Sequence, residues 1–315
     1  MNLLKTGVLL AALTAIFVIV GGLIGGKGGM LAAFVVAMIV NAVSYWFGAD
    51  LLLRAYGARN VTRASDPQLY DLVAELTVAA ALPMPRVYVI DSQQPNAFAT
   101  GRNPDNAAVA VTTGLMTTLT RQELAGVIGH ELAHIRNYDT LIMTVAASVA
   151  GAISMLADPR LVLGGGRDEQ GHSEGPGLLG GLLLIILAPL AAALVQMAIS
   201  RTREYEADRV GASICGQPIW LADALIRIHQ GVRQVPNQAA EQRPATAHLF
   251  IINPLHGGRM SELFSTHPPT GERVRLLRQM ASTLGGGEIA RLAGYTSQAG
   301  RQGPSSGLRG VVGRL

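Results

Sequence analysis

Cysteine and charge are both scarce in this chain. Its 315 residues include one cysteine, Cys215, which excludes an intramolecular disulfide and a metal site built from several thiolates. Asp, Glu, Lys and Arg make up 15% of the residues, whereas an ordinary soluble domain has about 25%. Because 49% of the residues are hydrophobic and the mean hydropathy is +0.33, this deficit of charge predicts segments that face lipid.

A large basic excess is also missing. The formal net charge is +4, and no run of basic residues is interleaved with aromatic residues. The sequence therefore gives no support for nucleic-acid binding. Its Lys and Arg residues are better interpreted as signals of membrane topology.

Four apolar windows reach or approach the roughly 20 residues that a membrane-spanning helix needs. They lie at 6–26, 28–49, 140–157 and 175–200. The first window is longer than the apolar core of a cleavable signal peptide and a second follows at once, which favours a retained helix. The third is the shortest, and the last two windows are also compatible with buried helices of a soluble domain.

Basic residues cluster on one side of this predicted array of helices, which orients it by the positive-inside rule. With four crossings and a cytoplasmic N-terminus, the segments 50–139 and 201–315 share the cytoplasmic side. The loop at 158–174 then faces outward and shows no basic excess. The basic residues that set the orientation are Lys5, Arg54, Arg59, Arg63, Arg201, Arg203 and Arg209. Glycines that suit close packing of the first two helices are Gly21, Gly22, Gly25, Gly26 and Gly28.

The remaining sequence predicts helices and two strands. Ser65-Asp66-Pro67 is typical of a helix start, and Thr120 with Glu123 fits a capping box for a helix that runs to about Tyr138. Strands are predicted at 86–90 and 107–112, and a turn-rich stretch at 93–103. Further helices are predicted at 201–212, 219–232 and 272–280, with an exposed loop at 234–243.

The capped helix carries Gly-His-Glu-Leu-Ala-His at 129–134. His130 and His134 are four residues apart and share one helix face, so both imidazoles can reach one metal ion. Glu131 can then address a water molecule in the open position of a zinc site and take its proton. The pattern predicts a zinc peptidase, because polar groups on so apolar a helix otherwise need another buried partner.

A third protein ligand has to come from elsewhere in the chain. The extended motif with further Gly and His ligand positions is absent, since Asn137 and Thr140 stand there. A downstream glutamate is the alternative: Glu204 can bind the metal while Asp208, one turn later, accepts the free N–H of a ligand histidine. On helical periodicity alone, Glu204 is equally well interpreted as a surface charge or as a ligand. The rival ligands are His172, His229, His248, His256 and His267.

Four segments together resemble the HtpX family of membrane proteases, which is related to the CaaX prenyl proteases. They are Gly-His-Glu-Leu-Ala-His at 129–134, Ser-Arg-Thr-Arg-Glu-Tyr-Glu-Ala-Asp at 200–208, Pro-Asn-Ala-Phe-Ala at 95–99 and Thr-His-Pro-Pro-Thr-Gly-Glu-Arg at 266–273. The resemblance covers nearly the whole chain, except the tail after about Ala293.

The resemblance implies a role for several further residues. One zinc ion per chain would be held by His130, His134 and Glu204, with Asp208 as the supporting carboxylate. His267 would stabilise the oxyanion and Arg273 would support the site electrostatically. Asn96 and Ala97 would lie on an edge strand that holds the substrate backbone. His248 and His256 receive no role and are interpreted as loop histidines.

The expected fold is a mostly α, α+β zincin-like (gluzincin) protease domain with about four transmembrane helices. Its expected parts are a transmembrane helix pair (1–49), the first half of the cytoplasmic domain (50–139), a second helix pair with an outward loop (140–200), the second half of the domain (201–296) and a disordered tail (297–315).

The resemblance also implies a cellular role. The chain would be a multi-pass protein of a bacterial inner membrane, with an active site that faces the cytoplasm and cleaves damaged or misfolded membrane proteins. Two alternatives stay open, namely a CaaX-type processing protease and a non-enzymatic zinc-binding scaffold or sensor of the membrane. The second alternative leaves Glu131 without a role.

Overall fold

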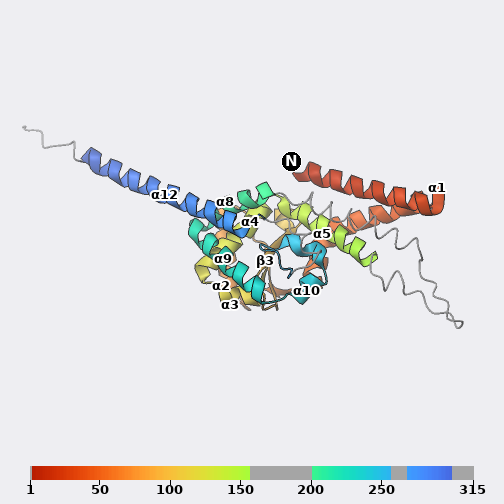
Figure 1. Cartoon of the computed structure of the whole chain (residues 1–315), viewed down its shortest axis with the longest axis horizontal. Coiled ribbons are helices and arrows are strands. Elements are labelled where there is room, and N and C mark those ends of the chain that lie inside the picture. Colours follow the sequence, from red (N-terminus) through yellow and green to blue (C-terminus); the bar gives the residue numbers. More distant parts are fainter. Residues whose placement is uncertain (1, 157–200, 257–267, 300–315) are drawn as a thin grey trace, which may run out of the picture.

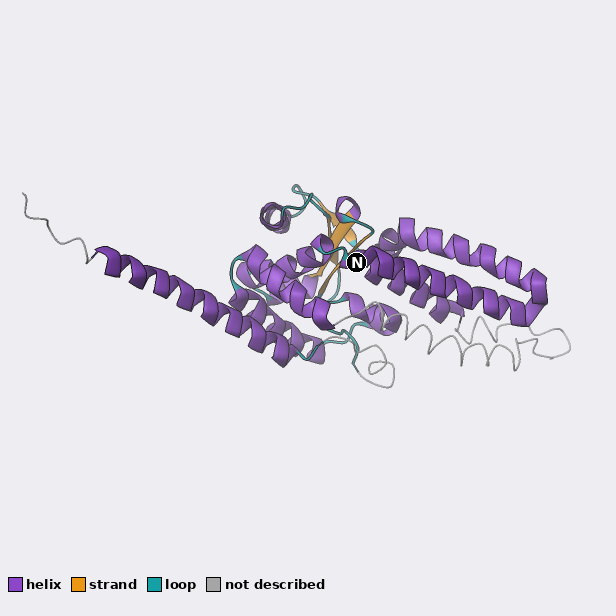
Figure 2. Ribbon diagram, turned by 90° about the horizontal axis from the view of Figure 1, so that it is seen from above, coloured by secondary structure: helices purple, strands orange, loops and turns teal. Residues whose placement is uncertain are grey.

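A computed structural model describes residues 2–156, 201–256 and 268–299. A helical hairpin extends from one side of a compact mixed domain, and a long C-terminal helix extends from the other side (Figures 1 and 2). The described residues are mostly helical with one small sheet, as the sequence predicts.

The hairpin is formed by α1 (Asn2–Ala55), which folds back on itself at Gly25 and Gly26, where the backbone leaves helical geometry. Gly26 has a φ of 58°, a conformation in which a residue with a Cβ is strained. The two arms approach so closely that a Cβ on Gly21 would collide with the carbonyl oxygen of Gly29. The predicted close packing is therefore confirmed for Gly21 and Gly22, whereas a Cβ on Gly25, Gly26 or Gly28 would meet no atom within 4 Å.

One helix among the described residues, Gly25–Ala55, is long and apolar enough to cross a membrane. Its large apolar side chains are exposed, Leu31, Phe34 and Ile39 among them. The third window forms α5 (Asp139–Leu156), of which residues 141–147 are buried, partly against α1. The fourth window lies outside the described residues. Four crossings therefore stay a prediction.

The sheet has the strand order β1-β2-β4-β3. Its strands are β1 (Arg59–Val61), β2 (Arg86–Ile90), β3 (Ala97–Gly101) and β4 (Ala107–Thr112). β2 and β4 are parallel, and the other two pairs are antiparallel. The predicted strands 86–90 and 107–112 are confirmed as β2 and β4.

The turn-rich prediction for 93–103 is wrong over residues 97–101, which form the edge strand β3. The strand is short, its side chains other than Phe98 are small, and turn residues lie on both sides of it, at Pro95 and at Asn103 to Pro104. What holds this strand in place is its pairing with β4, from Ala97 opposite Val111 to Gly101 opposite Ala107. Pairing of this kind depends on a partner strand and is invisible in local sequence.

The helices that surround the sheet begin where their capping residues predict. Asp66 accepts a hydrogen bond of 3.0 Å from Leu69 N at the start of α2 (Pro67–Ala80). The capping box of Thr120 and Glu123 starts α4 (Arg121–Arg136). The other principal helices are α3 (Thr113–Thr118), α8 (Arg201–Cys215), α9 (Pro218–Gln234), α10 (Gln238–Glu241) and α12 (Thr270–Ala299).

Two boundaries differ from the predictions. The expected loop at 234–243 contains the short helix α10. The expected helix at 272–280 is longer, because α12 continues to Ala299 and so includes the first residues of the predicted disordered tail. The rest of that tail lies outside the described residues.

Helices α4 and α8 meet at a pair of glycines. A Cβ on Gly129 would lie 2.7 Å from the carbonyl oxygen of Gly211, and a Cβ on Gly211 would lie 2.6 Å from His130 N. No side chain fits between two backbones at this distance. Glu204 precedes Gly211 by about two turns on the same face of α8, so this contact sets its distance from His130.

We expect Gly211→Val to push α8 away from α4, since the new side chain would overlap the backbone of His130. Overpacking of this kind costs about 1–3 kcal/mol of unfolding free energy, and binding of the zinc ion that the sequence predicts should weaken as well. Thermal melts and zinc titration measure both effects. Gly271→Ala is the control, because a Cβ there meets open space. Equal melts and zinc affinities for wild type and Gly211→Val would contradict the role of this contact.

Candidate metal centre

Three side chains from two helices converge at the contact between α4 and α8. His130, His134 and Glu204 each offer one ligand atom, and these atoms lie within 4.8 Å of one another. The Nε2 atoms of the two histidines are 3.2 Å apart. The carboxylate oxygens of Glu204 lie 3.7 Å from His130 Nε2 and 3.6 Å from His134 Nε2. All three side chains are buried, and in the described part of the chain they form the one such cluster.

A buried carboxylate stands behind each histidine. Asp208 Oδ1 lies 3.0 Å from His130 Nδ1, and Asp139 Oδ2 lies 3.2 Å from His134 Nδ1. A carboxylate accepts a hydrogen bond, so each Nδ1 carries a proton, and each Nε2 presents a lone pair when the ring is neutral, as a metal ligand must be. The lone pairs of both rings therefore point into the same space as the carboxylate of Glu204, which is the arrangement of metal ligands.

Sequence reasoning missed Asp139. Its carboxylate reaches back to His134 because Tyr138, between α4 and α5, has a φ of 59°, which turns the chain sharply after the helix. A signal was present, since Asp139 is an acidic residue at the entrance of an apolar window, where a buried charge needs a partner. Arg203 Nη1 lies 3.9 Å from the other oxygen of Asp139 and shares this charge.

Arg273 supports the opposite side of the cluster. It is 1% exposed and donates from Nε and Nη2 to the two oxygens of Asp208, at 2.8 and 2.7 Å. Its Nη1 donates to Ile251 O at 2.8 Å and lies 4.0 Å from Glu204 Oε2. Burial raises the pKa of the Asp208 carboxyl, but the charge and hydrogen bonds of Arg273, together with those of His130, outweigh burial and lower that pKa.

Glu131 lies beside the cluster and is 2% exposed. Burial raises the pKa of its carboxyl to about 7, although the backbone of Ala99 on β3 forms a hydrogen bond that works in the other direction. A carboxyl group with a pKa near neutrality is suited to accept a proton and to return it.

The two imidazoles respond differently to the same surroundings. Burial lowers the pKa of His130 to about 4. Burial also acts to lower the pKa of His134, but the carboxylates of Glu204, Asp139 and Glu131 outweigh it and raise that pKa to about 9. The cluster thus concentrates negative potential between the three ligands, where a cation is attracted.

Asn96 and Ala97 lie at the start of the edge strand, as the resemblance implied, and both are buried. Their free side is paired with another segment of the chain. Ile251 N donates to Ala97 O at 3.0 Å, and Asn96 Nδ2 donates to Ile252 O at 2.8 Å. The segment 251–252 therefore lies along this end of β3.

The other histidines do not join the cluster where they are described. His248 is buried, with Nε2 3.1 Å from Met143 O on α5. His229 Nδ1 lies 3.3 Å from Thr270 Oγ1, and the backbone N–H of His256 donates to Glu241 at 2.7 Å. His172 and His267 lie outside the described residues, so the oxyanion role of His267 stays a prediction.

Asp139→Ala should weaken zinc binding by about 10–100-fold, the usual loss when a carboxylate behind a ligand histidine is removed. His134 would lose the acceptor that orients its ring. Competition with a fluorescent zinc chelator measures the affinity. Asp105→Ala, at an exposed position, is the control, and equal affinities in the two variants would show that Asp139 does not orient His134.

Comparison with known proteins places this site in a family. A crystal structure of S. mikatae Ste24p is similar over 88% of this chain, at 18% sequence identity and a TM-score of 0.47, and the match spans 65% of that protein. The model of peptidase family M48 matches residues 63–281, a stretch that holds all three clustered ligands, Glu131, Asp139, Asp208 and Arg273. This match confirms the metalloprotease relationship that the motifs indicated, and the chain belongs to peptidase family M48.

Proposed function

We propose that the chain is a zinc-dependent endopeptidase of a bacterial inner membrane. The observation that carries this proposal is the convergence of His130, His134 and Glu204 on one point, with the buried carboxyl of Glu131 beside them. A non-enzymatic zinc scaffold would need the three ligands but would not need the additional carboxyl group of Glu131 at the site.

The donor atoms fit zinc. In tetrahedral zinc sites with bonds of about 2.0–2.1 Å, neighbouring donor atoms lie roughly 3.3–3.4 Å apart. The distances here, 3.2, 3.6 and 3.7 Å, are close to this spacing. Two imidazoles and one carboxylate are the ligand set of catalytic zinc in several peptidases, and they leave one position for water or substrate. Zinc held by these three residues would supply Lewis-acid activation of the water and of the peptide carbonyl.

The chain's own residues supply the remaining chemistry. Glu131 accepts a proton from the attacking water and transfers it to the nitrogen of the leaving amine. Arg273 holds Asp208, and Asp208 holds the imidazole of His130 in its ligating orientation. His267, as the resemblance implies, donates a hydrogen bond to the oxyanion that forms during attack.

The substrate backbone would bind beside β3. This strand is at the edge of the sheet and packs against α4, which carries the ligands. A peptide that pairs with an edge strand gains backbone hydrogen bonds without any requirement on its sequence, which suits a protease with many substrates. A peptide that reaches Ala97 O would have to replace the hydrogen bond from Ile251 N.

The membrane role rests on the hairpin of α1. Its exposed apolar side chains over Gly25–Ala55 would face lipid, and Trp46, with Arg102 stacked 4.6 Å from its ring centroid, would lie near the interface. We propose in addition that the chain crosses the membrane four times, that its active site faces the cytoplasm, and that its substrates are damaged or misfolded membrane proteins.

Glu131→Gln should abolish cleavage of casein and self-cleavage while zinc stays bound, because the amide keeps the size of the side chain but cannot accept the proton. Metal analysis and gel assays, with and without chelator, measure the two properties on the same sample. Chelator-sensitive cleavage that persists in the variant would refute the role of Glu131 as the base.

Glu204→Ala should lose stoichiometric zinc, because two histidines alone form an incomplete site. Glu206→Ala is a matched control on the same helix, since Glu206 is paired with Arg209 at the surface and should keep its zinc. Metal analysis after dialysis decides the point. A full complement of zinc in Glu204→Ala would place the third ligand elsewhere.

A further inference from the structure

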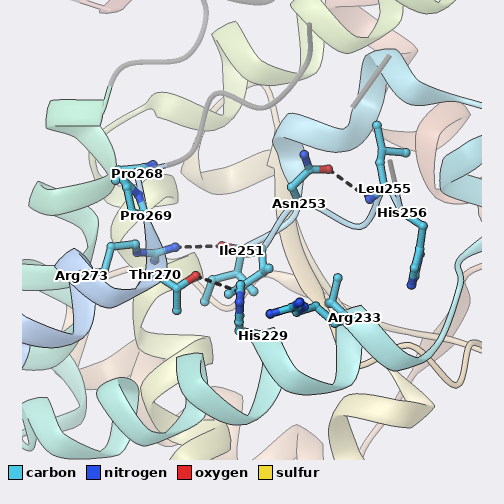
Figure 3. Close-up of a pocket in the computed structure, with 12 residues that line it drawn as sticks. His229, Arg233, Ile251, Asn253, Leu255, His256, Pro268, Pro269, Thr270 and Arg273 are labelled. Carbon is cyan, nitrogen blue, oxygen red and sulfur yellow. Dashed lines mark hydrogen bonds between the residues drawn. The ribbon is translucent and has the colours of Figure 1, made fainter. Parts of the chain in front are cut away.

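A cavity of about 450 Å³ is lined in part by Arg273, the residue that supports the metal centre (Figure 3). It is bounded by the end of α9, the segment 251–256 and the first turn of α12. Its polar lining side chains are His229, Arg233, Asn253, His256, Thr270 and Arg273. The volume is sufficient for a few residues of a peptide but not for a folded partner.

The cavity shares a wall with the proposed active site. Arg273 lines the cavity and also binds Asp208, behind His130. Its Nη1 donates to the backbone of Ile251, and Ile251 in turn donates to Ala97 on the edge strand. A substrate bound along β3 would therefore be separated from this cavity by about the width of one side chain.

Among the residues that the structure describes, the ionisable side chains that line the cavity are all basic. Arg273 is neutralised by Asp208, and Glu241 lies 4.0 Å from His256 Nδ1. Two basic side chains of α9, His229 and Arg233, have no acidic partner among the described residues, and they are four residues apart on one face of the helix. Both side chains point toward the cavity in Figure 3. Within the ranges that the structure describes, Arg233 has no ion pair.

This arrangement favours an anionic ligand. Two basic groups four residues apart on a helix destabilise it slightly when both are charged, and an anion between them removes that cost. The planar fork of Arg233 matches a carboxylate, and the contact between His229 and Thr270 holds the imidazole at the rim. A lipid headgroup is disfavoured, because α1 packs against α5 whereas α9 and α12 lie on the other side of the domain (Figure 1).

We propose that this cavity is a carboxylate-binding subsite of the peptidase, in which Arg233 and His229 bind an acidic side chain or the free C-terminus of the polypeptide substrate. The inference rests on the proposed endopeptidase function and adds a preference to it. Pairing with β3 accepts any backbone, so this subsite is what selects among peptides.

Peptide binding to the full-length, zinc-loaded Glu131→Gln protein in detergent tests the subsite without cleavage. The probes are fluorescein-labelled peptides of one sequence that carry either Glu or Gln, each with a free or an amidated C-terminus. Anisotropy should show about tenfold tighter binding of a carboxylate-bearing peptide, the loss expected when a charge-assisted hydrogen bond is absent. Preference for Glu over Gln, or for the free over the amidated end, identifies which carboxylate is bound.

In the same background, Arg233→Gln should abolish the preference and leave binding of the doubly neutral peptide unchanged. Arg278→Gln is the matched control, since Arg278 is an exposed arginine on α12 outside the cavity lining, and should keep the preference. His229→Gln is a second variant that should weaken it several-fold. Raising the salt concentration should also reduce the preference, because the groups are exposed.

Equal binding of all four peptides, or a preference that survives in both Arg233→Gln and His229→Gln, would overturn the subsite. Casein cleavage by the wild-type protein tests the endopeptidase function separately. Chelator-sensitive cleavage together with equal peptide binding would reject the subsite alone. A carboxylate preference in a wild-type protein that cleaves nothing would reject the peptidase function but retain the anion site.

Discussion

The close approach of α4 and α8 is the constraint on which the rest of the structure depends. Gly129 and Gly211 have no side chains to hold the helices apart, so Glu204 reaches two histidines that lie about seventy positions earlier in the chain. The ligand atoms then come within 4.8 Å without any support from a disulfide or a loop. Helices are rigid, so a site built across them is held more accurately than one on loops.

The metal centre also contains several buried charged side chains. Glu131, Asp139, Glu204, Asp208 and Arg273 are all nearly inaccessible to solvent, and isolated charges in such a position are strongly destabilising. Each of the two supporting carboxylates is therefore paired twice, Asp208 with His130 and Arg273, and Asp139 with His134 and Arg203. These pairs offset the cost of burying the charges, and they also orient the imidazole rings. The same interactions therefore stabilise the fold and set the geometry of the ligands.

The segment 251–252 links three parts of the protein. Its backbone binds the edge strand at Asn96 and Ala97, Arg273 binds its carbonyl group, and its other side lines the basic cavity (Figure 3). The edge strand, Arg273 and the cavity wall thus all contact the same two residues. The proposed binding edge and the proposed carboxylate subsite are therefore parts of one continuous surface.

The sequence by itself determined the features that depend on neighbours within a few residues: the capping box of α4, the pairing of His130 with His134 on one face, and the strands at 86–90 and 107–112. Only the tertiary structure showed that Glu204 lies within reach of both ligand histidines, because helical periodicity left Glu204 and five further histidines open. It also decided that 97–101 is an edge strand and that Asp139 supports His134. The reason is physical, because helix capping and periodicity are local, whereas strand pairing and ligand convergence depend on how distant segments pack.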